Sequence, residues 1–168
     1  MITLEALLES RDRRVQHQKA LLQAYPGCSL VCLTVQLPGP EKRSAKSLIV
    51  GGAGLAALLD KFGSIARHAH VRDLETGYEA YLLVPMPART VKHICCQIEE
   101  THPLGRLMDL DVLGEDGAPL ERTALGLPPR QCLLCGQPAR VCMRAKTHSR
   151  EALEEEIRRR IDAFCNNS

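Results

Sequence analysis

Tryptophan is absent from this chain of 168 residues, and aromatic residues of any kind make up only 3% of it. Hydrophobic residues still account for 45%, an ordinary share for a globular protein, so the core must consist of aliphatic side chains. The length is that of one domain and allows a sizeable core. We therefore expect a single domain over residues 1–168 with an aliphatic interior.

An excess of one charge is also missing, because 22 Lys and Arg stand against 20 Asp and Glu, giving a net charge of +2. A near-neutral chain with few aromatic residues lacks the features typical of nucleic-acid binding. No signal-peptide pattern follows Met1, and the longest mostly apolar run, Leu48–Leu59, is too short to span a bilayer. Eight cysteines without a secretion signal are typical of the reducing cytosol. We expect a soluble, cytoplasmic protein that binds neither nucleic acid nor membranes.

Strand and helix patterns alternate within residues 26–123. Strands are expected at Ser29–Leu37, Ile65–Val71 and Tyr78–Val84 and in a last stretch after His102, with helices at Ser44–Phe62 and Ala88–Thr101. This order predicts an α+β fold with a ferredoxin-like split βαβ core, in which helices cover one face of an antiparallel or mixed sheet. One further strand is expected at Ala118–Thr123, after a turn signal.

Two helices are expected outside this core. The first, Thr3–Tyr25, has an apolar stripe and a basic face that is either solvated surface or a docking surface for an acidic partner. That face carries Arg11, Arg13, Arg14, His17 and Lys19. The second helix spans residues 149–165 and follows a cysteine-rich segment, 128–148.

Two aspartates alternate with apolar residues in the last core strand. Alternation places Asp109 and Asp111 on one face of the strand and Leu110 and Val112 on the other. Two neighbouring carboxylates repel each other unless a cation lies between them, and oxygen ligands suit Mg²⁺ that also binds phosphate. A solvent-facing strand edge with two charges is the alternative interpretation.

Gly and basic residues near the aspartates favour a phosphate site. Gly105 allows a close backbone approach, and Arg106 is a fork-shaped anion binder. Lys42 follows the stiff turn Pro38-Gly39-Pro40 and could contact a phosphate at the start of the next helix. We therefore predict a metal-assisted phosphate site around Asp109.

The cysteine-rich segment allows three interpretations. Its Cys-x-x-Cys pair is followed by one more cysteine and a histidine, so Cys132, Cys135, Cys142 and His148 could hold Zn²⁺. Alternatively, the segment is a metal-free flap whose bases face an anionic substrate; these are Arg130, Arg140, Arg144 and Lys146. A thioredoxin-type redox pair is the third, but it lacks the helix expected directly after the motif.

These motifs together resemble those of one enzyme family. The matching stretches are 102–106 (His-Pro-Leu-Gly-Arg), 109–112 (Asp-Leu-Asp-Val), 127–130 (Leu-Pro-Pro-Arg), the Cys pair at 132 and 135, and 142–148. Thr34-Val35, the Pro-Gly-Pro turn with Lys42, and Ser10-Arg11-Asp12 fit the same family. The sequence closely resembles apo-citrate lyase phosphoribosyl-dephospho-CoA transferases, also called citrate lyase holo-acyl-carrier-protein synthases, over nearly its whole length.

The resemblance implies a reaction and its partners. The donor would be 2'-(5''-triphosphoribosyl)-3'-dephospho-CoA, the acceptor a serine of the citrate lyase acyl carrier protein, and the leaving group diphosphate. Catalytic roles would fall to Asp109, Asp111, Arg106 and His102, with Mg²⁺ on the two aspartates. Substrate-binding roles would fall to Arg11, Lys42, Gly105, Arg130 and Lys146.

Other interpretations stay open at this point. His102 could accept the serine proton, since imidazole titrates near neutral pH, or it could only cap the preceding helix. The same aspartates could serve another nucleotidyl or pyrophosphoryl transferase, and a zinc knuckle with surface aspartates would suit a protein-binding adaptor.

Overall fold

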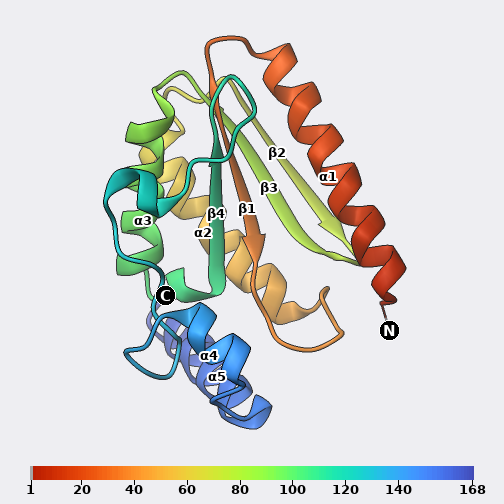
Figure 1. Ribbon diagram of the computed structural model, residues 1–168, viewed down its shortest axis with the longest axis vertical. Helices are drawn as coiled ribbons and strands as arrows, with labels where there is room; N and C mark the ends of the chain where they lie inside the picture. Colours follow the sequence, from red (N-terminus) through yellow and green to blue (C-terminus); the bar gives the residue numbers. More distant parts are fainter. Residues whose placement is uncertain (1) are drawn as a thin grey trace.

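A four-stranded antiparallel sheet is the centre of the protein, whose computed structural model describes residues 2–168 (Figure 1). The helices are α1 (Leu4–Ala24), α2 (Ala45–Phe62), α3 (Ala88–Thr101), α4 (Ala139–Ala145) and α5 (Arg150–Asn166). The strands are β1 (Ser29–Val35), β2 (His68–Leu74), β3 (Gly77–Val84) and β4 (Met108–Leu113), with short 3₁₀ turns η1 (Gly105–Leu107) and η2 (Arg122–Leu125). The strand order β2-β3-β1-β4, with every pairing antiparallel, confirms the expected α+β fold and its split βαβ order.

The two faces of the sheet are covered differently. Val31 and Leu33 of β1 point to the face under α2 and α3, where the larger core cluster lies. Leu30 and Cys32 point to the opposite face and pack in a smaller cluster with Leu21 of α1. Strand β1 is therefore buried on both faces, which explains its nearly continuous apolar sequence.

Helix α1 covers only part of the second face. Arg14 of α1 contacts Glu79 of β3, and Tyr25, which follows the helix, stacks on His68 of β2. Figure 1 shows the helix on the β2 side of the sheet. Strand β4 lies at the other edge of the sheet, beyond β1. The β4 side of this face therefore stays partly open to solvent.

The free edge of β4 is held by side chains. The backbone N–H of Leu110 donates to Oε1 of Glu99 over 2.8 Å, and Nζ of Lys92 donates to the Leu110 carbonyl over 2.9 Å. Leu120 N donates to the Val112 carbonyl over 2.8 Å. Glu99 and Lys92 are both buried. An edge strand whose polar backbone is satisfied in this way keeps a fixed register, so the side chains of β4 are well placed.

Three helices begin with the side-chain caps that favour helix starts. Thr3 accepts from the backbone N–H of Ala6 and Ser149 from that of Ala152, while Ser44 and Ser47 cap α2 reciprocally. No helix within residues 2–168 combines the length and apolarity that a bilayer crossing requires.

Three of the predicted strands differ from those in the structure. Strand β1 ends at Val35 instead of Leu37, before the Pro38 turn, and β2 spans His68–Leu74 instead of Ile65–Val71. The strand expected at 118–123 is only a single bridge between Leu113 and Pro119. The bonds from Leu120 N to the Val112 carbonyl and from Gly114 N to the Ala118 carbonyl form this bridge, and the chain then turns into η2.

Candidate functional site

The two aspartates of β4 lie on the partly open face of the sheet. Asp109 is paired in register with Thr34 and Asp111 with Cys32, so both share the face that α1 partly covers. Leu110 is buried on the other face. The alternation in the sequence thus places both carboxylates side by side, next to solvent.

Polar and charged side chains lie close to the two carboxylates. Oδ2 of Asp109 lies 3.4 Å from Nε2 of Gln36, and Oδ1 lies 3.6 Å from a guanidinium nitrogen of Arg130. Asp111 is exposed to solvent, yet partial desolvation of its carboxyl by the protein, and then the charge of Asp109, raise its pKa to about 6. Two neighbouring carboxylates repel each other, and a bound cation would relieve that repulsion.

Arg14 of α1 stands over this face and is a residue whose role the sequence interpretation missed. Its Nε donates to Oε1 of Glu79 over 2.8 Å, and Glu79 is buried. The Tyr81 hydroxyl donates to the other oxygen of Glu79 over 2.5 Å. The positive charge of Arg14 also acts on Asp111, where it favours the ionised carboxylate. Arg14 is seven residues from both Leu7 and Leu21, so helical spacing places it on the apolar side of α1. That spacing could have indicated that Arg14 faces the sheet.

Arg11 stays exposed on α1. It lies three residues before Arg14, which pairs with Glu79, so helical spacing places Arg11 next to the side of α1 that contacts the sheet.

Arg130 joins the cysteine-rich segment to the start of β4. Its guanidinium donates to the carbonyl oxygens of Met108 over 2.7 Å and Arg106 over 3.2 Å, besides its ion pair with Asp109. Gly105 directly precedes Arg106, and a Cβ added at Gly105 would stand 2.4 Å from the Glu99 carbonyl oxygen. Gly105 is therefore required by the close packing of η1 on α3.

Arg106 lies in a group of arginines. Its Nε is buried without a hydrogen-bond partner among residues 2–168. Burial, and then the positive charges of Arg130 and Arg160, lower the pKa of this guanidinium, while Cys132 acts in the opposite direction.

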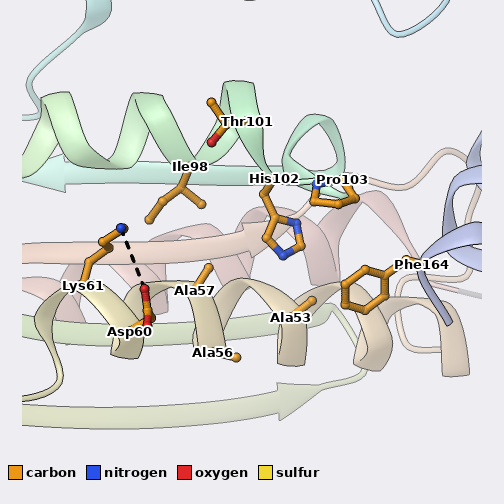
Figure 2. A pocket seen from close by; sticks show the side chains of 10 residues that line it. All are labelled: Ala53, Ala56, Ala57, Asp60, Lys61, Ile98, Thr101, His102, Pro103 and Phe164. Atoms are coloured by element: carbon orange, nitrogen blue, oxygen red, sulfur yellow. Dashed lines mark ion pairs between the residues drawn. The ribbon is translucent and has the colours of Figure 1, made fainter. Parts of the chain in front are cut away.

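The structure does not bring His102 to the aspartates. Figure 2 shows it on the helix face, lining a groove of about 420 Å³ between α2 and α3 with Phe164 at one end. Its Nδ1 accepts a hydrogen bond from Leu104 N over 3.0 Å, and burial lowers its pKa. This contact closes the turn after α3, while the backbone N–H of His102 donates to the Ile98 carbonyl at the end of that helix.

The two predicted lysines are also separate from the aspartate pair. Nζ of Lys42 donates to the Leu37 carbonyl over 2.9 Å, at the end of the turn after β1. Lys146 is exposed and ends α4 with a φ of 50°. Of the predicted residues, the structure therefore gathers Asp109, Asp111 and Arg130.

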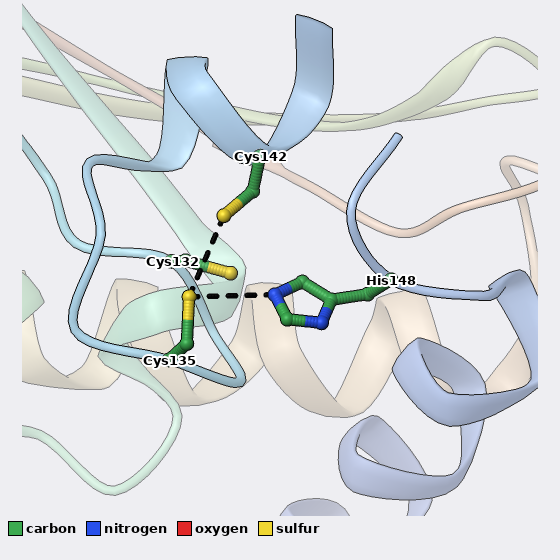
Figure 3. Close-up of side chains that lie close together, drawn as sticks. All are labelled: Cys132, Cys135, Cys142 and His148. Atoms are coloured by element: carbon green, nitrogen blue, oxygen red, sulfur yellow. Dashed lines mark hydrogen bonds between the residues drawn. The ribbon is translucent and has the colours of Figure 1, made fainter. Parts of the chain in front are cut away.

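The four predicted zinc ligands converge at one point (Figure 3). Their ligand atoms lie within 4.8 Å of one another, and Sγ of Cys135 is 3.4 Å from both Sγ of Cys142 and Nε2 of His148. Tetrahedral Zn²⁺ with bonds of about 2.0–2.3 Å requires ligand atoms at about this spacing. The cluster of Cys132, Cys135, Cys142 and His148 could bind a metal such as zinc.

The loop that carries the first two cysteines is a tight turn. Gln131 and Pro138 form a bridge, and Cys132 N donates to the Gln137 carbonyl over 2.7 Å. Burial alone would raise the pKa of Cys132, but hydrogen bonds from the backbone of Leu134 and Cys135 outweigh it and lower that pKa to about 7. The turn thus prepares a thiolate, which is the form that binds metal. We call residues 130–139 the knuckle.

Comparisons with known proteins give the family that the chain matches. The family model described as apo-citrate lyase phosphoribosyl-dephospho-CoA transferase matches residues 2–164. Two proteins of that name, from Escherichia coli O1:K1 / APEC and O45:K1 (strain S88 / ExPEC), are each 38% identical over 99% of this chain and 90% of their own. Protein CitXG of Haemophilus influenzae is 39% identical over 99% of this chain, which spans only 35% of that longer protein.

Proposed function

The chain belongs to the apo-citrate lyase phosphoribosyl-dephospho-CoA transferase family, and we propose that the open face of β4 is where its transfer takes place. The family reaction is the transfer of the phosphoribosyl-dephospho-CoA prosthetic group to apo-citrate lyase. The observation that carries the proposed site is the pair Asp109 and Asp111, side by side on a fixed strand at the solvent edge of the sheet.

We propose the following partners and bond changes. The donor is 2'-(5''-triphosphoribosyl)-3'-dephospho-CoA, and the acceptor is a serine of the citrate lyase acyl carrier protein. The serine oxygen bonds to the α-phosphorus, the bond from that phosphorus to diphosphate breaks, and the hydroxyl proton is lost to solvent or a base. The product is a phosphodiester that joins the prosthetic group to the acceptor.

Asp109 and Asp111 are proposed to hold Mg²⁺ at this face. Bound there, the ion would polarise the phosphate and neutralise charge on the departing diphosphate. Arg130 is fixed beside Asp109 by three backbone carbonyls, so it adds positive charge without needing to reorganise. Arg14, held by Glu79, and Arg11, on the same side of α1, line the opposite side of the open face.

His102 is not assigned as the base in this arrangement. It lies on the helix face of the sheet, and its Nδ1 already accepts the Leu104 N–H. Gly105 is assigned to packing, while Lys42 and Lys146 are left as candidate contacts for outer parts of the donor. The acceptor serine is then deprotonated by a group outside this set or by solvent.

We further propose that the Cys132, Cys135, Cys142 and His148 cluster holds Zn²⁺ in a structural site. Four protein ligands complete a tetrahedron and leave no open position for substrate. Metal analysis of protein purified without chelators should find about one zinc per chain. Absence of metal in fully active protein would instead support the metal-free flap.

The experiment that tests the function is intact mass spectrometry of the acceptor. The chain is incubated with apo-acyl carrier protein of citrate lyase, the triphosphoribosyl donor and Mg²⁺. The acceptor mass should increase by one phosphoribosyl-dephospho-CoA group, and diphosphate should appear in equal amount. An unmodified acceptor with intact donor would leave the adaptor interpretation, whereas transfer to a different acceptor would favour another transferase.

A further inference from the structure

Three large apolar side chains of α1 are exposed on one side of the helix. Leu4, Leu8 and Val15 are 73%, 50% and 48% exposed, and they lie outside both core clusters of residues 2–168. Steps of three or four residues join them and two bases into one line about 22 Å long. We call this the outer line of α1, and its members are Leu4, Leu8, Arg11, Val15 and Lys19.

The outer line faces the side of α1 on which β4 lies. Leu22, seven residues after Val15, continues the line and is buried in the smaller core cluster with Leu113, the last residue of β4. The Cδ1 atom of Leu22 would lie 4.0 Å from a Cβ added at Gly117, in the loop after β4. The line is therefore covered where it reaches β4 and its loop, and exposed before that point.

The opposite side of α1 is turned to β2. His17 lies nine residues after Leu8, and so about half a turn away, and its ring centroid is 5.5 Å from that of His70 in β2. The hydroxyl oxygen of Ser10 lies 2.8 Å from that of Thr76, in the turn between β2 and β3. The outer line therefore borders the open part of the sheet, which carries the aspartate pair.

The sheet sets the distance between the outer line and the aspartate pair. Asp109 pairs in register with Thr34, and Thr34 pairs with Glu79. Glu79 in turn holds Arg14, which directly precedes Val15 in α1. This row crosses β4, β1 and β3, which is two strand spacings or about 10 Å. A protein that covers the outer line could therefore place one of its side chains at the aspartate pair.

The charge of the outer line is positive. Its two bases, Arg11 and Lys19, are exposed, and the line contains no acidic residue. The ion pairs that α1 forms within residues 2–168 involve Arg13 and Arg14 instead. A partner surface with apolar and acidic side chains would complement this line.

The family reaction requires a second substrate of this size. The prosthetic group is transferred to apo-citrate lyase, so the acceptor is itself a protein. A specific protein–protein interface buries about 800 Å² on each partner, which is more than two aspartates on one strand provide. The acceptor must therefore also cover surface beside the open face. The edge of β4 is already covered by Glu99 and Lys92, whereas the outer line is exposed.

We propose that the outer line of α1 docks the acceptor protein through a surface of apolar and acidic side chains, an inference that rests on the reaction site proposed at β4. Leu8 and Val15 are the apolar anchors of this contact. Lys19 adds an electrostatic attraction, which mainly speeds the encounter and fixes the orientation of the acceptor.

The test separates the KM for the acceptor from the KM for the donor. The double variant Leu8→Gln/Val15→Gln removes exposed apolar surface and keeps residues that a helix accepts. Its KM for the apo-acceptor should rise about 10-fold, the usual effect of truncating interface anchors, while kcat and the KM for the donor stay at wild-type values. The affinity for the apo-acceptor, measured without donor or Mg²⁺, should fall by the same factor.

The double variant Leu48→Gln/Leu59→Gln is the matched control. These side chains are 46% and 41% exposed, but they belong to α2, on the other face of the sheet. This variant should bind and modify the acceptor as wild type does.

Lys19→Glu tests the charge of the outer line separately. The KM for the acceptor should rise, and the difference from wild type should shrink as the salt concentration increases, because salt screens exposed charges. A KM that stays at the wild-type value at low salt would contradict the role of Lys19.

The outcomes separate the docking surface from the reaction site. Wild-type protein that binds the acceptor without modifying it would overturn the reaction site, and the affinity of Leu8→Gln/Val15→Gln would still decide the docking surface. Transfer by wild type, with unchanged acceptor KM and affinity in that variant, would overturn the docking surface alone. A raised KM for the donor only would overturn it too and assign the outer line to the donor. Wild type that neither binds nor modifies the acceptor would overturn both.

Discussion

The Nε of Arg14 donates a hydrogen bond to Oε1 of Glu79 over 2.8 Å, which joins α1 to β3 of the sheet. Glu79 is only 2% exposed, and it also accepts the Tyr81 hydroxyl and pairs with Arg72 at 3.8 Å. A buried carboxylate is stable only with such partners. The same contact fixes a cation beside the open face that carries Asp111.

Glu79→Gln should therefore affect both stability and donor binding. Loss of the charge-assisted contact to a partly exposed arginine should cost about 2 kcal/mol of unfolding free energy, measured by urea denaturation. The KM for the donor should rise because Arg14 is no longer held. Glu75→Gln is the control, since Glu75 pairs with Arg43 at the surface and should change stability by less than about 0.5 kcal/mol. Equal effects of the two substitutions would contradict this role of Glu79.

Gly105→Ala should severely destabilise the fold. The added Cβ would stand 2.4 Å from the Glu99 carbonyl oxygen and 2.6 Å from that of Ile98, so η1 would have to move away from α3. We expect a loss of more than about 3 kcal/mol, as for other overpacked backbone sites. Gly52→Ala, in α2 with no atom near the new Cβ, should instead stabilise by about 0.5–1 kcal/mol. A well-folded, stable Gly105→Ala protein would mean that this close approach is not required.

Asp111→Asn should make stability less dependent on pH. The folded chain raises the pKa of Asp111 from 3.8 to about 6, so the folded state binds this proton more tightly than the unfolded state. Ionisation of Asp111 therefore costs stability, and the cost develops as the pH rises from about 4 to about 6. At pH 8, without divalent cations, about 2 °C or more of added Tm is expected for Asp111→Asn, and this gain should be nearly lost at about pH 4. A variant less stable than wild type at pH 8 would contradict the cost of ionising Asp111, which comes from desolvation and then from the charge of Asp109.

The sequence predicted the elements that depend on local pattern. Alternation placed Asp109 and Asp111 on one face of β4, and the Cys-x-x-Cys spacing found a cluster that the fold closes with Cys142 and His148. Both patterns are short-range, so the backbone period or a single turn decides them.

Long-range contacts explain what the sequence could not predict. In the sequence, Arg14 is one of several charges on a basic helix face. Only the fold shows that its side chain points to the sheet, where it pairs with Glu79, 65 residues later in the chain. His102 precedes the aspartates closely in sequence, yet the chain passes from the helix face to the sheet between them, so they lie on opposite faces. Sequence proximity is therefore a poor guide where a helix ends and a strand begins.

The rate at which Asp109→Asn modifies the acceptor tests the central claim most directly. With saturating donor, Mg²⁺ and apo-carrier protein, single-turnover mass gain should be slower than wild type by about 10²–10³-fold, because one anionic ligand of the metal is lost. Zinc content should match wild type and the variant should unfold cooperatively at a Tm no lower than that of wild type, while Asp60→Asn, which changes an exposed carboxylate of α2, should react at the wild-type rate. Transfer by folded Asp109→Asn within a few-fold of wild type would show that the reaction does not take place at the aspartate pair of β4.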